Sequence, residues 1–521
     1  MVKQANDAIS ISVISNIIFE PHFISLIELN FEKDNPAIYP IPLEEYQEYN
    51  YRQQLSRSDM VVVWLNYKEL FPDNANKRYA NVLTEPQAIE EGVSACEKLH
   101  DDIRSISPNA HILWFSFEAY YAFMPITMGY AYNSLIDKVN SKLAELLCSK
   151  AVFIDLEHLI AEVGIANAYD SRGKYRWNAP YSKALVEVAA KEIYKQYLIE
   201  KGLTKKCLVF DCDNVLWGGI LSEDGVENIK LGGSGFGRAY QDFQRFILSL
   251  YYHGVILAVC SKNDLFDVMT MFREHSEMVL KEEHIACFQV NWENKPDNIK
   301  RIAETLNIDL DSMVFVDDSP IEIEAVKAML PEVTTILYTR DTMYEQFSCF
   351  NLKCDVDSGS IEKRNESYQT NQFRESLKAQ YNSYEDYINA LEIKLDIHKA
   401  MPIEYSRISE LTQRTNKCTN GIRYTIAEIK ERVDLENVTL YSLSVFDRFS
   451  DLGLVGAIEV EADTLTLFSL SCRALGREIE SGMLEHIASK YQIGNIKFKS
   501  TGKNEDIKML LLKAFQGAIL T

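Results

Sequence analysis

Three short apolar runs in the middle of the chain each lead into a polar residue, and this pattern restricts the possible folds most strongly. The runs and the polar residues that follow them are Leu208–Phe210 with Asp211, Val255–Val259 with Ser261, and Met313–Val316 with Asp317. In an open parallel sheet, the carboxyl ends of the strands lie at one edge, and ligands bind beyond that edge. The pattern therefore predicts a parallel α/β sheet with one candidate site where the three strand ends meet.

The segment Asp211-Cys212-Asp213 places two carboxylates two residues apart at the end of the first of these strands. A carboxylate at a strand end can attack phosphorus and form an aspartyl-phosphate. A second carboxylate on the same side of an extended loop can protonate the leaving oxygen and later activate water. The spacing therefore predicts Asp211 as a nucleophile and Asp213 as a general acid and base.

Two further residues supply groups that a phosphoryl-transfer site needs. Ser261 offers a hydroxyl to the phosphoryl oxygens, and Lys295 offers a positive charge. A divalent ion would screen the repulsion between a carboxylate and a phosphate, and carboxylate oxygens are suitable ligands for Mg²⁺. The residues expected to bind Mg²⁺ are Asp211, Asp213, Asp317 and Asp318.

The order of these residues along the chain resembles the four motifs of the haloacid dehalogenase (HAD) superfamily. Longer segments resemble the FkbH-like proteins, and the resemblance covers roughly residues 200–521, with a looser match before them. The segments are LVFDCDNVLWGGILSEDG, AVCSKND, LNIDLDSMVFVDDSP, FDRFSDLGLVG, SLSCRALGRE and TGKNE. This resemblance implies a HAD phosphatase domain fused to an acetyltransferase-like (GNAT-like) domain, after a region that resembles the SGNH hydrolases.

The function that the resemblance implies is a bifunctional, Mg²⁺-dependent enzyme. It would remove phosphate from a phosphoglyceryl-type substrate and load the acyl group onto the phosphopantetheine arm of an acyl carrier protein. Two alternatives stay open. The chain could be a stand-alone phosphatase of a small phosphorylated metabolite with a C-terminal domain that only binds, or a scaffold that docks a carrier protein without turnover.

In the C-terminal domain, Cys472 follows a predicted strand and precedes a glycine turn. Its thiolate could carry the acyl group as a thioester, and the alternative is a small buried core thiol. Gly476 and Arg477 precede a predicted helix, where backbone amides could bind the pyrophosphate of CoA or the arm of a carrier protein. A plain turn is the alternative. Arg414 and Asn416 could line an acyl pocket, or form surface salt bridges and caps.

The apolar runs and the resemblance together divide the chain into four parts. We expect an SGNH-like α/β domain over residues 1–200, a Rossmann-like HAD domain with a minimal cap over 201–355, a helical linker over 356–390, and a GNAT-like α+β domain over 391–521. Ser15 stands where an SGNH nucleophile would lie. The first domain has no Gly-Asp-Ser, so we expect it to be a non-catalytic docking or structural module.

The composition narrows the possible partners. There are 54 Lys and Arg against 76 Asp and Glu, which gives a net charge of −22. This charge repels phosphate backbones and argues against a nucleic-acid partner. An acidic carrier protein would need a local basic patch for docking. No apolar run approaches the roughly 20 residues of a membrane span, and ten cysteines without a regular framework indicate reduced thiols and a cytoplasmic protein.

Overall fold

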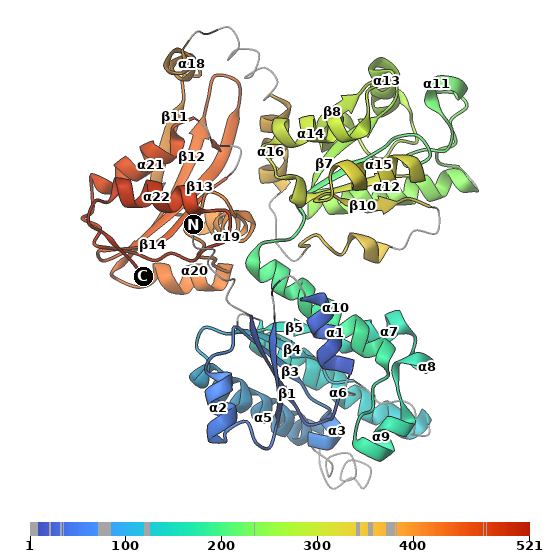
Figure 1. The fold of residues 1–521 in the computed structure, drawn as a ribbon, viewed down its shortest axis with the longest axis vertical. Helices are drawn as coiled ribbons and strands as arrows, with labels where there is room; N and C mark the ends of the chain where they lie inside the picture. The colour runs from blue at the N-terminus through green and yellow to red at the C-terminus, as the bar shows by residue number, and fades with distance from the viewer. Residues whose placement is uncertain are drawn as a thin grey trace. The chain divides into compact units, whose positions relative to one another are not determined.

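The chain forms two compact units, Met1–Glu200 and Lys201–Thr521, which Figure 1 draws as a ribbon. The computed structural model describes residues 9–521 except 20–21, 32–33, 35, 71–84, 119–125, 149, 234, 340–343, 353–357, 371–380, 382, 472–473 and 476. The fold is mixed α/β, with two five-stranded parallel sheets and one six-stranded mixed sheet. None of the helices in this described part of the chain has the length and apolar character that crossing a bilayer requires.

The first unit is built on a parallel sheet in the order β2-β1-β3-β4-β5. Its strands are β1 (Ser10–Ser15), β2 (Ala37–Pro42), β3 (Met60–Trp64), β4 (His111–Phe115) and β5 (Val152–Ile154). Its helices are α1 (His22–Asn30), α2 (Tyr49–Leu55), α3 (Tyr67–Leu70), α5 (Glu85–Ile106), α6 (Ile126–Leu147), α7 (Leu156–Val163), α8 (Ile165–Ala168), α9 (Ser171–Trp177) and α10 (Lys183–Lys201). Helices α1, α7 and α10 cover one face of the sheet, and α2, α5 and α6 cover the other.

The sequence pattern did not predict β2, because Pro40 and Pro42 interrupt its alternation. Proline cannot donate to a sheet and is tolerated on an edge strand, which is where β2 lies. Ser15 ends β1, and its Oγ accepts a hydrogen bond from the backbone N–H of Ile17 at 3.1 Å. The hydroxyl at the expected nucleophile position is therefore engaged in a local turn.

Buried polar groups gather beyond the carboxyl ends of β1, β3 and β4. The Nδ2 of Asn66 donates to the carboxylate of Glu118 at 2.8 Å, and the side chain of Asn16 bonds both the N–H and the carbonyl of Asn66. Glu118 is buried. Burial raises the pKa of Glu118 to about 7, although hydrogen bonds from Tyr181 and Asn66 favour its charged form.

This pKa makes the stability of the first unit depend on pH. A carboxyl group whose pKa is higher in the folded chain favours folding at low pH, and this contribution is lost as pH rises through about 7. Urea unfolding followed by circular dichroism should show a loss of about 1.4 kcal/mol between pH 6 and pH 8. Glu118→Gln should abolish this loss, whereas Glu90→Gln at an exposed position should retain it. An unchanged pH dependence in Glu118→Gln would contradict the assignment.

The second unit begins with a parallel sheet in the order β10-β9-β6-β7-β8, which confirms the parallel sheet predicted for the middle of the chain. The strands are β6 (Cys207–Phe210), β7 (Ile256–Ser261), β8 (Ile285–Val290), β9 (Met313–Asp317) and β10 (Thr334–Leu337). Its short elements are α11 (Leu221–Asp224), η3 (Glu282–His284), η4 (Leu310–Ser312) and η5 (Tyr344–Phe347). Both faces of the central strands are buried, as their continuous apolar runs require.

Helices cover both faces of this sheet. One face packs against α12 (Phe236–Tyr252) and α13 (Leu265–Glu274), and the other against α14 (Lys295–Leu306) and α15 (Pro320–Met329). The sequence pattern did not predict β8 and β10, the two edge strands, whose residues are less completely buried than those of the central strands.

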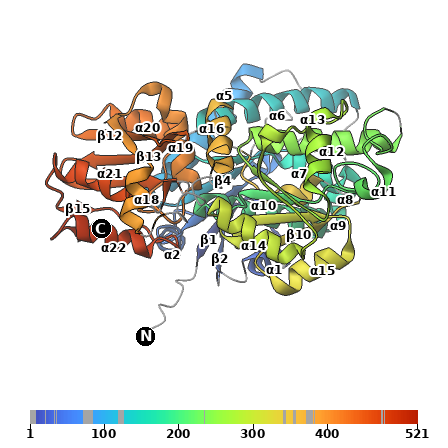
Figure 2. The same ribbon diagram turned by 90° about the horizontal axis from the view of Figure 1, so that it is seen from above.

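The C-terminal sheet has the order β11-β12-β13-β14-β15-β16. Its strands are β11 (Lys394–Lys399), β12 (Val438–Phe446), β13 (Asp451–Glu461), β14 (Thr464–Leu470), β15 (Asn495–Ile496) and β16 (Ile519–Leu520). The first four are antiparallel, and β15 runs parallel to both β14 and β16. One face carries α19 (Tyr405–Arg414) and α20 (Ile426–Val433), and the other carries α21 (Ile479–Ala488) and α22 (Glu505–Ala514) (Figure 2). The turn η6 (Pro402–Glu404) precedes α19.

The stretch expected to be a linker contains α16 (Ser358–Gln369) and α18 (Tyr384–Ala390). Helix α16 packs against β8 of the middle sheet and against β13 of the C-terminal sheet. Its Ile361 and Tyr368 join the cores on the two faces of the middle sheet. The helix is therefore an integral part of the second unit, because it buries apolar side chains against the middle sheet and also contacts the C-terminal sheet.

Candidate active site

A buried lysine lies between two carboxylates at the carboxyl edge of the middle sheet. Asp211 directly follows β6, Asp317 ends the neighbouring strand β9, and Lys295 begins α14 after β8. The Nζ of Lys295 is 2.7 Å from Oδ2 of Asp211 and 2.5 Å from Oδ2 of Asp317. These three side chains are almost fully buried. The parallel topology thus brings together residues that lie more than 100 positions apart in the sequence.

Three carboxylates at this edge can share a cation. One oxygen from each of Asp211, Asp317 and Asp318 lies within 4.8 Å of the other two. Oδ1 of Asp211 is buried and has no hydrogen-bond partner among the described residues. Three carboxylates and the ammonium of Lys295 leave a net charge of −2, which a divalent ion would neutralise. An all-oxygen donor set suits Mg²⁺, so the residues present fit this ion.

The carboxylate of Asp213, which was also expected to bind Mg²⁺, is not among these three. Its Oδ1 accepts hydrogen bonds from Nε1 of Trp217 at 2.9 Å and from the backbone N–H of Leu221 at 3.2 Å. Its Oδ2 accepts a hydrogen bond from Nδ2 of Asn263 at 3.0 Å. These three donors orient the carboxylate away from the cation group, as a separate acid and base would require.

Burial dominates the electrostatics of the site. It raises the pKa values of Asp213 and Asp318, and it raises the pKa of Asp317 to about 6 despite the opposing charge of Lys295. Burial alone would lower the pKa of Lys295, but the charges of Asp211 and Asp317 more than offset this effect. Its pKa therefore lies above its ordinary value, and Lys295 stays charged at neutral pH.

Ser261 ends β7 at the same edge and is buried. Its Oγ accepts a hydrogen bond at 3.1 Å from Nδ2 of Asn263, the amide that also bonds Asp213. The sequence analysis did not identify Asn263. Its position two residues after Ser261 could have identified it. Side chains two residues apart on extended backbone point the same way, which is the argument used for Asp211 and Asp213.

The structure describes only one of the three site residues predicted near the C-terminal strand β14. Cys472 and Gly476 lie outside the described residues. Arg477 lies two residues before α21, and its Nη1 is 3.6 Å from Oδ2 of the buried Asp447. Oδ1 of Asp447 accepts backbone hydrogen bonds from Phe449 and Ser450. The guanidinium of Arg477 thus faces a carboxylate of its own domain.

Two residues that could have lined an acyl pocket bind the middle sheet. Arg414 donates through Nη2 to the carbonyl of His253 at 2.5 Å, and Asn416 donates through Nδ2 to the carbonyl of Gly202. His253 precedes β7 and Gly202 precedes β6. Arg414 also lies at the C-terminal end of α12, where a cation interacts favourably with the helix dipole. Both side chains therefore serve as contacts between the two sheets of the second unit.

Lys503 makes a further contact of the same kind. Its Nζ is 3.0 Å from Asp309 and 2.5 Å from Asp311, on the segment that leads into β9. All of these contacts involve the amino ends of the middle strands, whereas the carboxylate cluster lies at their carboxyl ends. Strand β9, Met313–Asp317, lies between these contacts and the cluster and spans about 13 Å.

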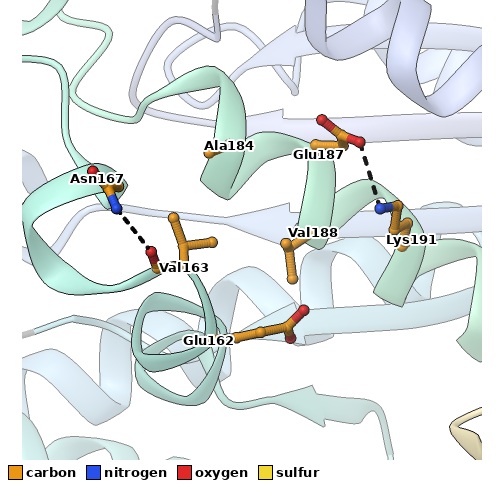
Figure 3. A pocket seen from close by; sticks show the side chains of 7 residues that line it. All are labelled: Glu162, Val163, Asn167, Ala184, Glu187, Val188 and Lys191. Carbon is orange, nitrogen blue, oxygen red and sulfur yellow. Dashed lines mark hydrogen bonds and ion pairs between the residues drawn. The ribbon is translucent and has the colours of Figure 1, made fainter. Parts of the chain in front are cut away.

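A hollow in the first unit is unrelated to this site. Figure 3 shows that it opens between α7, α8 and α10, and its lining residues are Glu162, Val163, Asn167, Ala184, Glu187, Val188 and Lys191. Nδ2 of Asn167 donates to the carbonyl of Val163, and Lys191 pairs with Glu187 at 3.4 Å. Its one cation is therefore already paired, and the hollow contains none of the predicted site residues.

The fold is similar to the crystal structure of the N-terminal part of the protein BF1531 from Bacteroides fragilis, which contains a phosphatase domain complexed with Mg. The match has a TM-score of 0.57 and 25% sequence identity, and it covers 67% of this chain and 96% of that one. It supports the HAD-like fold expected for the middle domain. No protein-family model and no curated protein matches the sequence.

Two other structures give matches too weak to carry an argument. The lipase Lip_vut3 from a goat rumen metagenome has 16% identity and a TM-score of 0.27, and the match covers 35% of this chain and 97% of that one. The salicylyl-acyltransferase SsfX3 from a tetracycline biosynthetic pathway has 10% identity and a TM-score of 0.26, over 37% of this chain and 56% of that one.

The carboxylate cluster predicts that Mg²⁺ binding weakens in acid. Protons and the metal compete for Asp317, whose pKa is about 6, so affinity should fall about fourfold from pH 7.5 to pH 5.5. Calorimetric titration of the full chain with Mg²⁺ measures this change. Asp317→Asn should weaken binding at both pH values, whereas Asp242→Asn, at a surface ion pair, should behave like the wild type. Equal wild-type affinity at the two pH values would contradict the prediction.

Proposed function

We propose that residues 201–521 contain a Mg²⁺-dependent phosphatase that forms an aspartyl-phosphate on Asp211. The observation that carries this proposal is the buried cluster of Asp211, Lys295 and Asp317, with one oxygen of Asp211 left without a partner among the described residues. The similarity of the fold to a phosphatase domain complexed with Mg supports it. When bound by Asp211, Asp317 and Asp318, Mg²⁺ would reduce the repulsion between these carboxylates and the phosphate.

In the first step, the carboxylate of Asp211 attacks phosphorus and the bond from phosphorus to the ester oxygen breaks. Asp213 gives its proton to the departing oxygen, so the alcohol leaves neutral and the phosphoryl group stays on Asp211. Lys295 and Ser261 lie at the same sheet edge and can hold the phosphoryl oxygens through an ammonium and a hydroxyl. The ammonium of Lys295 is also in direct contact with the carboxylate of Asp211.

In the second step, Asp213 is a carboxylate and takes a proton from a water molecule. The water oxygen bonds to phosphorus, the bond from phosphorus to Asp211 breaks, and phosphate leaves. Asp213 is protonated again and Asp211 is a free carboxylate, so the cycle closes. The raised pKa of Asp213 favours the protonated form that the first step needs.

The fuller function that we propose is the loading of an acyl group from a phosphoglyceryl-type substrate onto an acyl carrier protein. The motifs of the C-terminal domain support it, as does a mixed sheet in which α21 joins the parallel strands β14 and β15. The length of β9, about 13 Å, separates the phosphatase edge from the contacts with the C-terminal sheet, and a long flexible phosphopantetheine arm would suit this separation. The same separation favours the alternative of a stand-alone phosphatase.

For the first unit we propose an SGNH-like docking module without hydrolase activity. Two contacts support this role. The hydroxyl of Ser15 accepts a hydrogen bond from Ile17, and the buried carboxyl of Glu118 is held by Asn66. In this arrangement the hydroxyl is used in a turn, and the acid at the carboxyl edge of the sheet is part of the structure.

Asp211→Asn should abolish phosphate release, because an amide cannot attack phosphorus. We expect a loss of at least about a thousandfold in turnover of a generic phosphate ester. The melting temperature should stay close to that of the wild type, and chelation of Mg²⁺ should give the same loss. The surface variant Asp242→Asn should keep its activity within about twofold of the wild type. Substantial turnover by Asp211→Asn would exclude the mechanism.

A mixing experiment tests acyl loading and distinguishes it from the stand-alone alternative. Asp211→Asn should load a carrier protein without removing phosphate, and Cys472→Ser should remove phosphate without loading. A mixture of the two should produce the dephosphorylated acyl carrier, because an intermediate carried on a mobile arm can also pass from one molecule to another. Intact mass of the carrier gives the result, and each variant alone is the control. No loading by the wild type would favour the stand-alone phosphatase.

A further inference from the structure

The amide of Asn263 links two residues of the candidate active site. Its Nδ2 donates one hydrogen bond to Oδ2 of Asp213 at 3.0 Å and another to Oγ of Ser261 at 3.1 Å. Both amide hydrogens are therefore used. The opposite orientation of the amide would place its oxygen against the carboxylate, which is repulsive, so the hydrogen bonds fix the orientation.

The environment of Asn263 is more typical of a side chain that serves function than of one that stabilises the fold. It is buried, and its Oδ1 has no hydrogen-bond partner among the described residues. A buried polar atom without a partner opposes folding. The side chain is thus held in a position that costs stability, while its nitrogen contacts the predicted acid and base.

Trp217 holds the other oxygen of the same carboxylate. Its Nε1 donates to Oδ1 of Asp213 at 2.9 Å, and its indole is fully buried and packs edge-on against Phe272. The donor is therefore fixed by packing. Asn263 follows β7 and Trp217 follows β6, so two neighbouring strands fix the carboxylate from different sides.

A carboxylate in this place needs such restraint. Asp213 lies two residues from Asp211, beside a site that contains the ammonium of Lys295 and the group of carboxylates that fits Mg²⁺. Both cations would attract an unrestrained carboxylate and leave no acid beside the ester oxygen. The donors of Asn263 and Trp217 instead keep Asp213 outside the cation group.

From this geometry we infer that Asn263 is a positioning residue that, together with Trp217, directs Asp213 toward the leaving oxygen of the substrate. The inference rests on the proposed phosphatase function. It concerns only the transfer of the proton from Asp213 to the departing oxygen as the phosphorus–oxygen bond breaks. An ester whose alcohol is a poor leaving group needs this proton, whereas p-nitrophenolate leaves without it.

The test compares kcat/KM of the full chain with Mg²⁺ on two esters, glycerol 3-phosphate and p-nitrophenyl phosphate. This ratio reports the steps up to formation of the aspartyl-phosphate. Asn263→Ala should lower it on the order of 10- to 100-fold for glycerol 3-phosphate and less than about threefold for p-nitrophenyl phosphate. Trp217→Phe keeps an aromatic ring and loses the N–H. Like Asn263→Ala, it should lower kcat/KM more for glycerol 3-phosphate than for p-nitrophenyl phosphate. Asp213→Asn should give the largest difference between them.

Two control variants separate positioning from other effects. Ser261→Ala removes the hydroxyl that Asn263 also contacts. It should lower kcat/KM equally for the two esters. Asn298→Ala removes another buried asparagine, which forms a hydrogen bond with Asn291. It should not change kcat/KM for one ester more than for the other. Equal losses on the two esters in Asn263→Ala, or no loss on either, would overturn the role. Absence of phosphate release from both esters by the wild type would instead overturn the proposed function, and the positioning role with it.

Discussion

The ion pairs of Lys295 with Asp211 and Asp317 are the constraint on which the rest of the site depends. A lysine is rarely buried as completely as Lys295, and burial of its charge is unfavourable unless opposite charges lie within contact distance. The ammonium in turn offsets the repulsion between the two carboxylates, but together with Asp318 the group keeps an excess of negative charge. That excess is the electrostatic reason for a divalent ion at this edge.

The site also depends on the division of the middle sheet into two edges. The carboxyl ends carry the acids, the lysine and Ser261, while the amino ends are occupied by contacts from Arg414, Asn416 and Lys503. The C-terminal domain is thus fixed to the sheet without any of these contacts reaching the carboxylate cluster.

The separation of roles between the acidic residues follows from hydrogen bonding more than from sequence spacing. Asp211 and Asp213 are two residues apart and have the same charge. Asp211 faces Lys295, whereas Asp213 faces neutral donors from Trp217 and Asn263. One carboxylate thus has a charged partner, whereas burial raises the pKa of the other and makes it better able to take up a proton. One loop thereby supplies a nucleophile and an acid.

The sequence by itself determined the parallel middle sheet and the meeting of Asp211, Ser261 and Asp317 at one edge, because apolar runs form buried strands and parallel strands end together. It did not predict the edge strands β2, β8 and β10, whose weaker burial or prolines obscure their pattern. Only the tertiary structure decided that Asp213 lies outside the cation group and that Asn416 contacts Gly202. The latter contact joins residues 214 positions apart, and no local pattern records a hydrogen bond between such distant segments.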